Sequence, residues 1–430
     1  MHELCYTRLR LRVIVIFWDS SGIPIQIFCN ESDLHMSTLL LVIIYVAFIG
    51  LGLPDSLLGT AWPVAYIDLG VPVGAAGLVT MIGTASTVTS SLLAERLIKA
   101  LGTARVAFIS VLLTALALMG MGFVQHYWIV LVLAIPLGLG AGTIDTALNN
   151  FVALNYKATH MNWLHSFWGV GATAGPAIMA LFLSSGNWHG AYRAISLALF
   201  SISLLLALSI PLWKRVGHAP VLHEHRKAVP LKKLFRRPGA VFACLAFFTY
   251  CAGEYSAGLW ASTYFVQVKG VTPDTAASWA SMYYLGITLG RLVSGFAAIR
   301  LKSRTLVRIG NLAILLGLLG LITLPGAGQL IGLLLVGLGC GPVFPSLLDQ
   351  TPEFFGVEYS QGMMGLQIAS AYTGSALMAP LFGWISPFIG IGFWPFFLLV
   401  FFGVMIFSTE NTLRSVKKAA GMSPVAEPQA

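Results

Sequence analysis

Charged residues and cysteines are both scarce in this sequence. Only 10% of its 430 residues are charged, whereas 57% are hydrophobic. A soluble domain needs more charged and polar side chains to cover its surface, so the composition excludes an ordinary soluble protein. The five cysteines show no spacing typical of a disulfide framework or of a metal site. The composition indicates an integral membrane protein without a metal centre.

Motifs of several enzyme classes are absent as well. The sequence contains no phosphate-binding loop, no Gly-x-Ser-x-Gly motif and no pair of histidines spaced as metal ligands on a helix. No large soluble segment could power an ATP-driven pump. We therefore expect neither enzymatic activity nor a cofactor. The net charge of +9 is not accompanied by aromatic residues among the basic ones, so no nucleic-acid partner is expected.

Long apolar runs dominate the sequence instead. About twelve runs approach the ~20 residues that an α-helix needs to cross the hydrocarbon core of a lipid bilayer. They lie at roughly 38–66, 73–94, 104–124, 127–154, 162–185, 190–213, 239–267, 274–299, 305–324, 327–350, 359–384 and 387–408. The predicted fold class is therefore an all-α integral membrane protein with twelve transmembrane helices.

The basic residues indicate how these spans are oriented. They cluster after every second span, for example around Arg96, at 214–237 and at 300–308, whereas the alternate loops hold only Arg193 and Lys269. Lysine and arginine accumulate in cytoplasmic loops. We therefore expect a multi-pass protein of the cell membrane with both termini in the cytoplasm.

Residues 1–35 do not resemble the rest of the chain. Their apolar stretch at 13–18 is too short to span a membrane, and it lacks the small-residue cleavage site of a signal peptide. Met36 opens a normal first span. We expect residues 1–35 to be a disordered extension, or to be untranslated with Met36 as the first residue.

The apolar part of the chain is an internal duplication. The sequence LGLGAG at 137–142 recurs as VGLGCG at 336–341, and the flanking runs correspond in the same way. We expect a six-helix bundle at 36–213, a basic cytoplasmic linker at 214–238, a second six-helix bundle at 239–410 and a cytoplasmic tail at 411–430. Transporters built this way place their site between bundles related by a pseudo-two-fold axis.

Several motifs resemble a known family. They are LPD ending at Asp55, GAGTID ending at Asp145, NWLHSF beginning at Asn162 and YCAGE ending at Glu254. Together they resemble the major facilitator superfamily, and specifically its fucose permease-like sugar symporters. The resemblance covers about residues 36–410. It implies the two-bundle fold, a cation-coupled sugar transporter and a monomer.

Carboxylates within the apolar runs are the candidates for cation coupling. A charged side chain at bilayer depth costs at least ~2.5–3.5 kcal/mol, so such residues usually face a bundle interior or a wet cavity. Desolvation favours the neutral form of a carboxyl group, which lets it bind and release protons. Asp55, Asp145 and Glu254 meet this description, and the resemblance implies coupling roles for the two aspartates. The alternative for Asp145 is a structural hydrogen bond to a neighbouring helix, and the alternative for Asp55 is an aspartate at a helix end that reaches the outer headgroups.

Two further charged residues in these runs are less easily assigned. Asp349 lies near the end of its span beside polar neighbours, which favours a solvated or structural role. Arg291 is the one cation at bilayer depth, so it needs a carboxylate or backbone carbonyls as a partner.

Polar and aromatic residues near these carboxylates are the candidates for substrate binding. Asn162 and His165 are three apart on one helix face, where an amide and an imidazole offer both donors and acceptors to sugar hydroxyls. Aromatic rings pack well against sugar C–H faces. The expected substrate-binding residues are Asn162, His165, Asn149, Trp168, Trp260 and Tyr264.

The loop after the second span is the candidate cytoplasmic gate. The superfamily carries a glycine, an acid and several cations there, and this chain keeps Ser91, Glu95, Arg96 and Lys99. The resemblance implies that Glu95, Arg96 and Arg105 form ion pairs that stabilise the outward-facing state.

Taken together, the residues and the resemblance predict a secondary transporter for a small neutral polar solute. A monosaccharide moved with a proton is the expected pair, with sodium as the other possible cation. A proton-coupled drug or metabolite exporter of the same fold is the first alternative. A membrane scaffold or receptor that transports nothing is the second.

Overall fold

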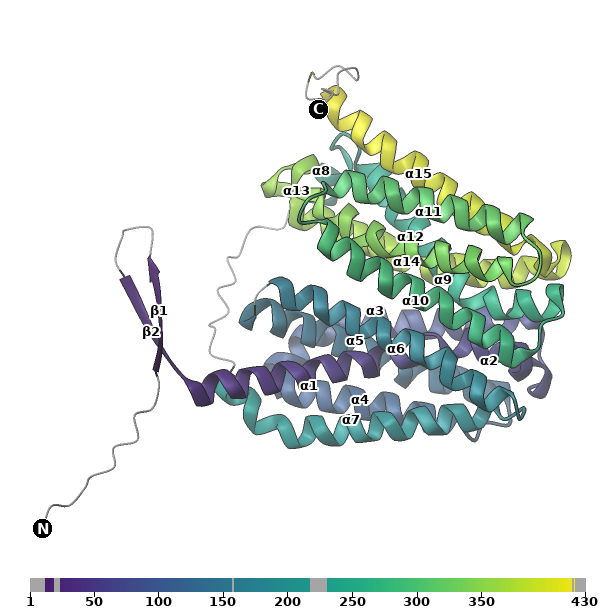
Figure 1. Ribbon diagram of the computed structural model, residues 1–430, viewed down its shortest axis with the longest axis horizontal. Coiled ribbons are helices and arrows are strands. Elements are labelled where there is room, and N and C mark those ends of the chain that lie inside the picture. The colour runs from purple at the N-terminus through teal and green to yellow at the C-terminus, as the bar shows by residue number, and fades with distance from the viewer. Residues whose placement is uncertain (1–11, 19–23, 157, 217–229, 420, 422–430) are drawn as a thin grey trace, which may run out of the picture.

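The computed structural model describes residues 12–18, 24–156, 158–216, 230–419 and 421. Almost all of them are helical, and they form two groups of long helices stacked one above the other (Figure 1). The first half contains α1 (Glu31–Asp55), α2 (Leu57–Asp68), the short η1 (Val73–Ala75), α3 (Ala76–Leu101), α4 (Thr103–Met121), α5 (Tyr127–Asn155), α6 (Ala158–Leu183) and α7 (Trp188–Val216).

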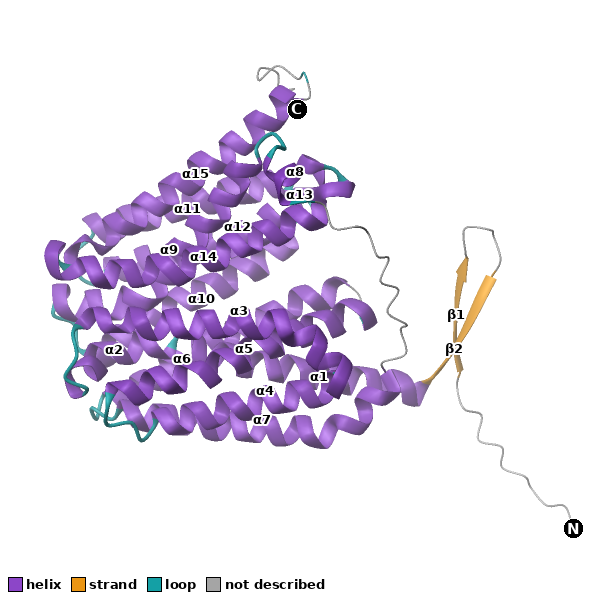
Figure 2. Ribbon diagram, turned by 180° about the vertical axis from the view of Figure 1, so that it is seen from behind, coloured by secondary structure: helices purple, strands orange, loops and turns teal. Residues whose placement is uncertain are grey.

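The second half repeats this series of helices. It contains α8 (Leu231–Phe235), α9 (Ala240–Lys269), α10 (Pro273–Ala297), α11 (Ser303–Thr323), α12 (Gly328–Asp349), α13 (Thr351–Phe355), α14 (Val357–Ile389), η2 (Ile391–Phe393) and α15 (Trp394–Ala419). Figure 2 shows the same two bundles from behind. The short helices α8 and α13 lie at the end of the molecule where α1 begins and α15 ends, which we call the terminal end. The opposite end is called the distal end.

The prediction of an all-α membrane protein is confirmed. Eleven helical segments of the described residues are long and apolar enough to cross a membrane. The twelfth expected span corresponds to α10, which has 25 residues but is more polar than the others. Its sequence includes Ser281, Tyr283, Tyr284 and Arg291, and these side chains face other helices of the protein or its interior.

The segment before the first span contains more structure than we expected. β1 (Arg12–Trp18) and β2 (Pro24–Asn30) pair as an antiparallel hairpin, and α1 starts directly after it at Glu31. The expectation of disorder therefore does not describe residues 12–18 and 24–35. The start of translation at Met36 stays a prediction.

The first span is broken in its middle. α1 ends at Asp55 and α2 begins at Leu57. Pro54, one residue before the end of α1, has no backbone N–H to donate to the helix. The hydroxyl of Ser56 donates to the carbonyl oxygen of Ala172 on α6, at 3.0 Å, and so attaches the break to a neighbouring helix. The break places the Asp55 carboxylate at a helix end inside the bundle.

Repeated glycines bring the helices of each bundle into backbone contact. A Cβ atom on Gly138 of α5 would lie 2.2 Å from the carbonyl oxygen of Gly83 on α3. In the second bundle, a Cβ atom on Gly337 of α12 would lie 2.1 Å from the carbonyl oxygen of Tyr283 on α10. Only glycine permits this closeness, and the same helices are paired in both halves. The two halves that repeat in sequence therefore also share the same helix packing.

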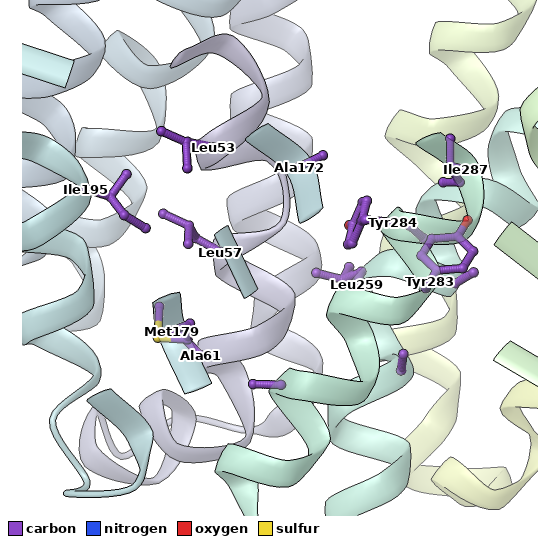
Figure 3. Packing of buried hydrophobic residues seen from close by; sticks show 14 of the residues in the cluster. Leu53, Leu57, Ala61, Ala172, Met179, Ile195, Leu259, Tyr283, Tyr284 and Ile287 are labelled. Atoms are coloured by element: carbon purple, nitrogen blue, oxygen red, sulfur yellow. The ribbon is translucent and has the colours of Figure 1, made fainter. Parts of the chain in front are cut away.

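The two bundles touch each other in the middle and toward the distal end. A Cβ atom on Gly74 of η1 would lie 2.2 Å from the carbonyl oxygen of Gly383 on α14, and the Ser281 hydroxyl of α10 donates to Thr173 O of α6 at 2.9 Å. Toward the terminal end the helices of the two bundles diverge (Figures 1 and 2). In Figure 3, buried residues such as Leu57 lie on one side of the bundle boundary and Tyr284 on the other.

Candidate functional site

Asp55 and Trp168 form the part of the site that belongs to the first bundle. Asp55 is exposed at the break between α1 and α2, midway along the first span. The indole Nε1 of Trp168 on α6 donates a hydrogen bond of 2.7 Å to its Oδ2 atom. Trp168, expected from the sequence to bind substrate, therefore contacts Asp55, which is a candidate for cation coupling.

Arg291 of α10 continues this arrangement into the second bundle. The guanidinium carbon of Arg291 lies 4.5 Å from the centroid of the Trp168 ring, a cation–π contact between the bundles. Nη2 of Arg291 lies 3.8 Å from Oε1 of Glu254, and the two side chains are 20% and 18% exposed. Glu254 is thus the carboxylate partner that the lone cation required.

Glu254 is held in place by two tyrosines. The hydroxyl of Tyr250 lies 3.0 Å from Oε1 of Glu254 and 2.9 Å from the carbonyl oxygen of Cys340, so it can donate to either oxygen. The hydroxyl of Tyr283 donates to the backbone oxygen of Glu254 at 3.0 Å. These contacts fix the carboxylate between α9, α10 and α12.

These contacts form one continuous series from the first bundle to the second. We call Asp55, Trp168, Arg291 and Glu254 the central polar chain. It has a carboxylate at each end, and its single cation lies nearer to Glu254. The central polar chain therefore connects the two bundles where they meet.

Asp145 of α5 lies beside this chain. Asn149, one helical turn further, donates from Nδ2 to the backbone oxygen and to Oδ1 of Asp145, both at 2.9 Å. Both residues are half-buried, and Asp145 is close enough to Asp55 for the two carboxylates to repel each other. The expected shared helix face of Asp145 and Asn149 is present. In this arrangement the Asn149 amide is occupied by Asp145.

His165 also faces the boundary between the bundles. Its ring is exposed, packs edge-on against Phe48 at 5.9 Å between centroids, and lies close enough to Arg291 to interact with its charge. Asn162 is part of the same helix α6, but its side chain lies outside the described part of the structure. Its role in substrate binding stays a prediction.

Trp260 and Tyr264 lie elsewhere than expected. Trp260 is 0% exposed, and its indole N–H donates to the carbonyl oxygen of Ala379 on α14 at 2.8 Å. Tyr264 is 3% exposed and packs against Trp394 with ring centroids 5.0 Å apart. In this arrangement both rings attach α9 to its neighbours and neither is accessible to a solute, so we do not retain them as substrate-binding residues.

The candidate gate residues lie near the end of α3 and at the start of α4. Glu95 forms an ion pair with Lys99 on its own helix, and both side chains are 67% exposed. Arg96 and Arg105 are exposed as well. In the second bundle, Arg304 pairs with Glu353, and Asp349 accepts a hydrogen bond from Ser303. The structural reading of Asp349 fits this contact.

A cavity of about 120 Å³ opens beside Asp55 inside the first bundle. Tyr255 of α9 contributes to its lining, so both bundles contact it. Most of the other lining residues are apolar, and the polar ones are threonines: Thr80, Thr84, Thr87 and Thr114. A solute in this cavity would reach Asp55 before it reached Glu254.

Sequence reasoning missed the partners of Arg291 and the roles of Tyr250 and Tyr283. The lone cation in an apolar run was a usable signal, because it had to have a partner. Which of the carboxylates it contacts depends on how α10 packs against α6 and α9, and no sequence spacing reports that. Tyr250 begins the YCAGE motif but was given no role of its own, and Tyr283 gave no signal that distinguished it from an ordinary core residue.

The arrangement defines a class of protein: a membrane protein of two repeat-related helical bundles with paired charges where the bundles meet. The family model of the Major Facilitator Superfamily matches residues 44–380 and 243–426. The chain therefore belongs to the major facilitator superfamily, a family of transporters and not of enzymes. This confirms the resemblance seen in the sequence.

Relatives with known names are similar at the sequence level. The glucose/mannose transporter GlcP of Bacillus subtilis is 28% identical over 312 residues, which cover 68% of this chain and 74% of that protein. Bypass of stop codon protein 6 of Saccharomyces cerevisiae is 23% identical over 326 residues, covering 67% of this chain and 64% of the yeast protein. The chain thus matches less than two thirds of the yeast relative.

Solved structures share the fold. A crystal structure of the nucleoside transporter NupG superposes with a TM-score of 0.69 at 14% identity, covering 87% of this chain and 98% of the other. A D-xylose-proton symporter gives 0.69 at 12% identity, covering 89% and 99%. The Escherichia coli fucose:proton symporter gives 0.59 at 18% identity, covering 87% and 98%. These likenesses establish the architecture.

Proposed function

We propose that this transporter moves a monosaccharide together with a proton. The observation that carries the proposal is the central polar chain, which puts carboxylates of both bundles in contact with one arginine and one tryptophan where the bundles meet. Sugar transporters named among the relatives and fold neighbours support the choice of solute. The choice of a proton is supported by the carboxylates at bilayer depth, because such residues in transporters commonly form proton relays.

The residues divide into two roles under this proposal. Asp55, Asp145 and Glu254 take part in cation coupling. His165 and Trp168 lie beside them on α6 and contact the sugar, as does Asn162 on the same helix. Asn149 positions the Asp145 carboxylate through its amide and releases that amide to the sugar only when Asp145 is protonated.

The terminal end of the molecule is the cytoplasmic end in this proposal. The basic residues Arg237, Arg300 and Arg304 lie there, as the positive-inside rule requires. Because the bundles diverge at that end and touch toward the other, the arrangement is inward-facing. The gate formed by Glu95, Arg96 and Arg105 closes that end only in the outward-facing state.

Uptake into proteoliposomes tests the proposal. Purified protein is reconstituted with an acidic exterior, and accumulation of labelled glucose, mannose, xylose and fucose is measured with and without a protonophore. We expect at least one sugar to be concentrated above its external level and the protonophore to abolish this. Equal accumulation driven by a sodium gradient alone would mean that sodium, and not the proton, is the coupling cation. Uptake of uridine but of no sugar would contradict the assigned solute.

Export of a more apolar solute is the second candidate. One observation favours it: the cavity beside Asp55 is lined mainly by apolar residues such as Leu58, Val79 and Met121. An exporter would exchange its solute for protons. Everted vesicles that take up a dye on acidification of their lumen, with no sugar uptake in the liposome assay, would establish this alternative.

A further inference from the structure

Asp55 and Glu254 occupy equivalent positions in the two repeats. A Cβ atom on Gly171 of α6 would lie 2.1 Å from the carbonyl oxygen of Ile49 on α1. A Cβ atom on Gly374 of α14 would lie 2.0 Å from the carbonyl oxygen of Phe248 on α9. Asp55 follows Ile49 by as many residues as Glu254 follows Phe248. The duplication has therefore left one carboxylate at the same place in each bundle.

The positive charge between these carboxylates is not duplicated. Arg291 lies within α10, but α3, the repeat counterpart of α10, contains no cation before Arg96 near its end. Two equivalent carboxylates are thus accompanied by a single arginine, which in this arrangement lies near Glu254.

The position of Arg291 is suited to exchange between the carboxylates. Its distance to Glu254, 3.8 Å, is longer than the ~2.7–3.2 Å of a well-formed hydrogen bond. By contrast, Arg308 contacts both oxygens of Glu410, at 3.0 and 3.1 Å. The Arg291 guanidinium rests on the ring of Trp168, whose N–H already contacts Asp55. The tryptophan thus provides a surface along which the guanidinium can pass toward Asp55.

We propose that Arg291 pairs alternately with Glu254 and Asp55, so that movement of the bundles decides which carboxylate is left to bind the transported proton. This inference rests on the proposed cation coupling. In the arrangement seen here Arg291 is near Glu254, and Asp55, exposed and held by a single N–H, is the carboxylate that takes up or releases the proton to water. In the opposite arrangement Arg291 reaches Asp55, and Glu254 keeps only Tyr250. Arg291 is a positioning residue, because it acts through the two carboxylates.

Other titratable groups surround the central polar chain and could contribute to a pH response. They come from every helix packed against it: Asp145, His165, Tyr250, Cys251, Tyr255, Tyr283, Tyr284, Cys340 and Tyr372. Because a pH profile would sum over all of them, the tests measure coupled accumulation at a fixed pH gradient and the distance between the bundles instead.

The first experiment measures coupling in Arg291→Gln. Accumulation of sugar against its gradient, driven by pH, is expected to be lost, while counterflow exchange, which needs no net proton movement, persists. Arg193→Gln is the matched control, because Arg193 also lies over an aromatic ring, Phe123 at 5.1 Å, but near the distal end of the molecule. Full accumulation in Arg291→Gln would overturn the inference.

The second experiment needs no substrate and therefore separates this inference from the proposed function. Spin labels are placed at Leu92 and Ile299, which are 78% and 80% exposed near the terminal ends of α3 and α10, in a background without native cysteines. Glu254→Gln frees Arg291 for Asp55 and is expected to shorten the distance between the labels. Asp55→Asn is expected to lengthen the distance between the labels or, where two distances are present, to leave only the longer one.

Arg291→Gln decides the outcome when it is combined with each of these substitutions. If Arg291 transmits the effect, Glu254→Gln and Asp55→Asn no longer differ in the Arg291→Gln background. If their opposite shifts persist without Arg291, or if both shift the distance in the same direction, the exchange does not occur. If the shifts appear as expected but no sugar is accumulated by the unmodified protein, the proposed solute is wrong and the exchange stands.

Discussion

Helices α5 and α12 are copies of each other in packing but not in chemistry. Gly142 of α5 approaches Thr87 of α3, and Gly341 of α12 approaches Arg291 of α10, so both helices pack on their neighbours through glycine. Three residues further along each helix, α5 carries Asp145 and α12 carries Phe344 at the corresponding position. Phe344 packs against Phe247 with ring centroids 5.2 Å apart. The helix packing shared by the two halves determines the fold. The single residues that differ between corresponding positions, such as Asp145 and Phe344, determine the site.

The comparison explains why the two bundles contribute unequally. The first bundle provides two half-buried or exposed carboxylates, Asp55 and Asp145, next to a cavity. The second provides one carboxylate, Glu254, with its arginine and two tyrosines. A carboxylate paired with an arginine in the second bundle therefore faces two carboxylates of the first bundle. The following predictions test this division.

The largest effect is expected from adding a methyl group to the shared packing. Gly138→Ala and Gly337→Ala each place a Cβ atom 2.1–2.2 Å from a backbone oxygen that no side-chain rotation can move. Overpacking of this kind costs ~1–3 kcal/mol or more. We expect both variants to lower the melting temperature in detergent by a similar amount and to reduce transport.

Gly365→Ala is the control for these variants, because no atom lies within 4 Å of its added Cβ. Alanine in a helix is favoured over glycine by ~0.5–1 kcal/mol. The control should therefore be neutral or slightly stabilising. If only one of the two packing variants were destabilised, the two halves would not share the same helix packing.

The second effect concerns the position at which α5 and α12 differ. Asp145→Asn keeps the shape of the side chain and its bond with Asn149, but it removes the proton-binding group. We expect pH-driven accumulation to be lost while counterflow persists in part. Phe344→Leu serves as the matched change in the second bundle and should preserve coupling. Normal accumulation by Asp145→Asn would make this carboxylate structural.

Much of the fold could be predicted because its signals are local. Apolar runs predicted the spans, and the recurrence of LGLGAG at 137–142 as VGLGCG at 336–341 predicted the repeated series of helices. The spacing of Asp145 and Asn149 places them on one helix face, but the hydrogen bond between their side chains was not predicted. Trp260 could not be placed, because an aromatic residue in the middle of a helix is equally compatible with a cavity and with a neighbouring helix. That choice depends on tertiary packing.

A third prediction compares Trp168 with Trp260. Trp260→Phe leaves the buried carbonyl oxygen of Ala379 without its 2.8 Å donor, which costs ~1–3 kcal/mol of stability. Its half-saturation concentration for sugar should not change. Trp168→Phe removes the N–H that contacts Asp55 and should impair coupling or affinity with little loss of stability. If only Trp260→Phe raised the half-saturation concentration, Trp260 would be a substrate-binding residue after all.

The smallest effect is expected at the gate. Lys99→Gln removes an ion pair with Glu95 in which both side chains are 67% exposed and lie one turn apart on α3. Exposed pairs of this kind contribute ~0.3–0.5 kcal/mol, so the melting temperature should hardly change. Because Lys99 then no longer competes for the Glu95 carboxylate, the spin-label distance between Leu92 and Ile299 should shift toward the closed terminal end. Glu95→Gln should shift that distance the other way, and equal distances in both variants would exclude Glu95 from the gate.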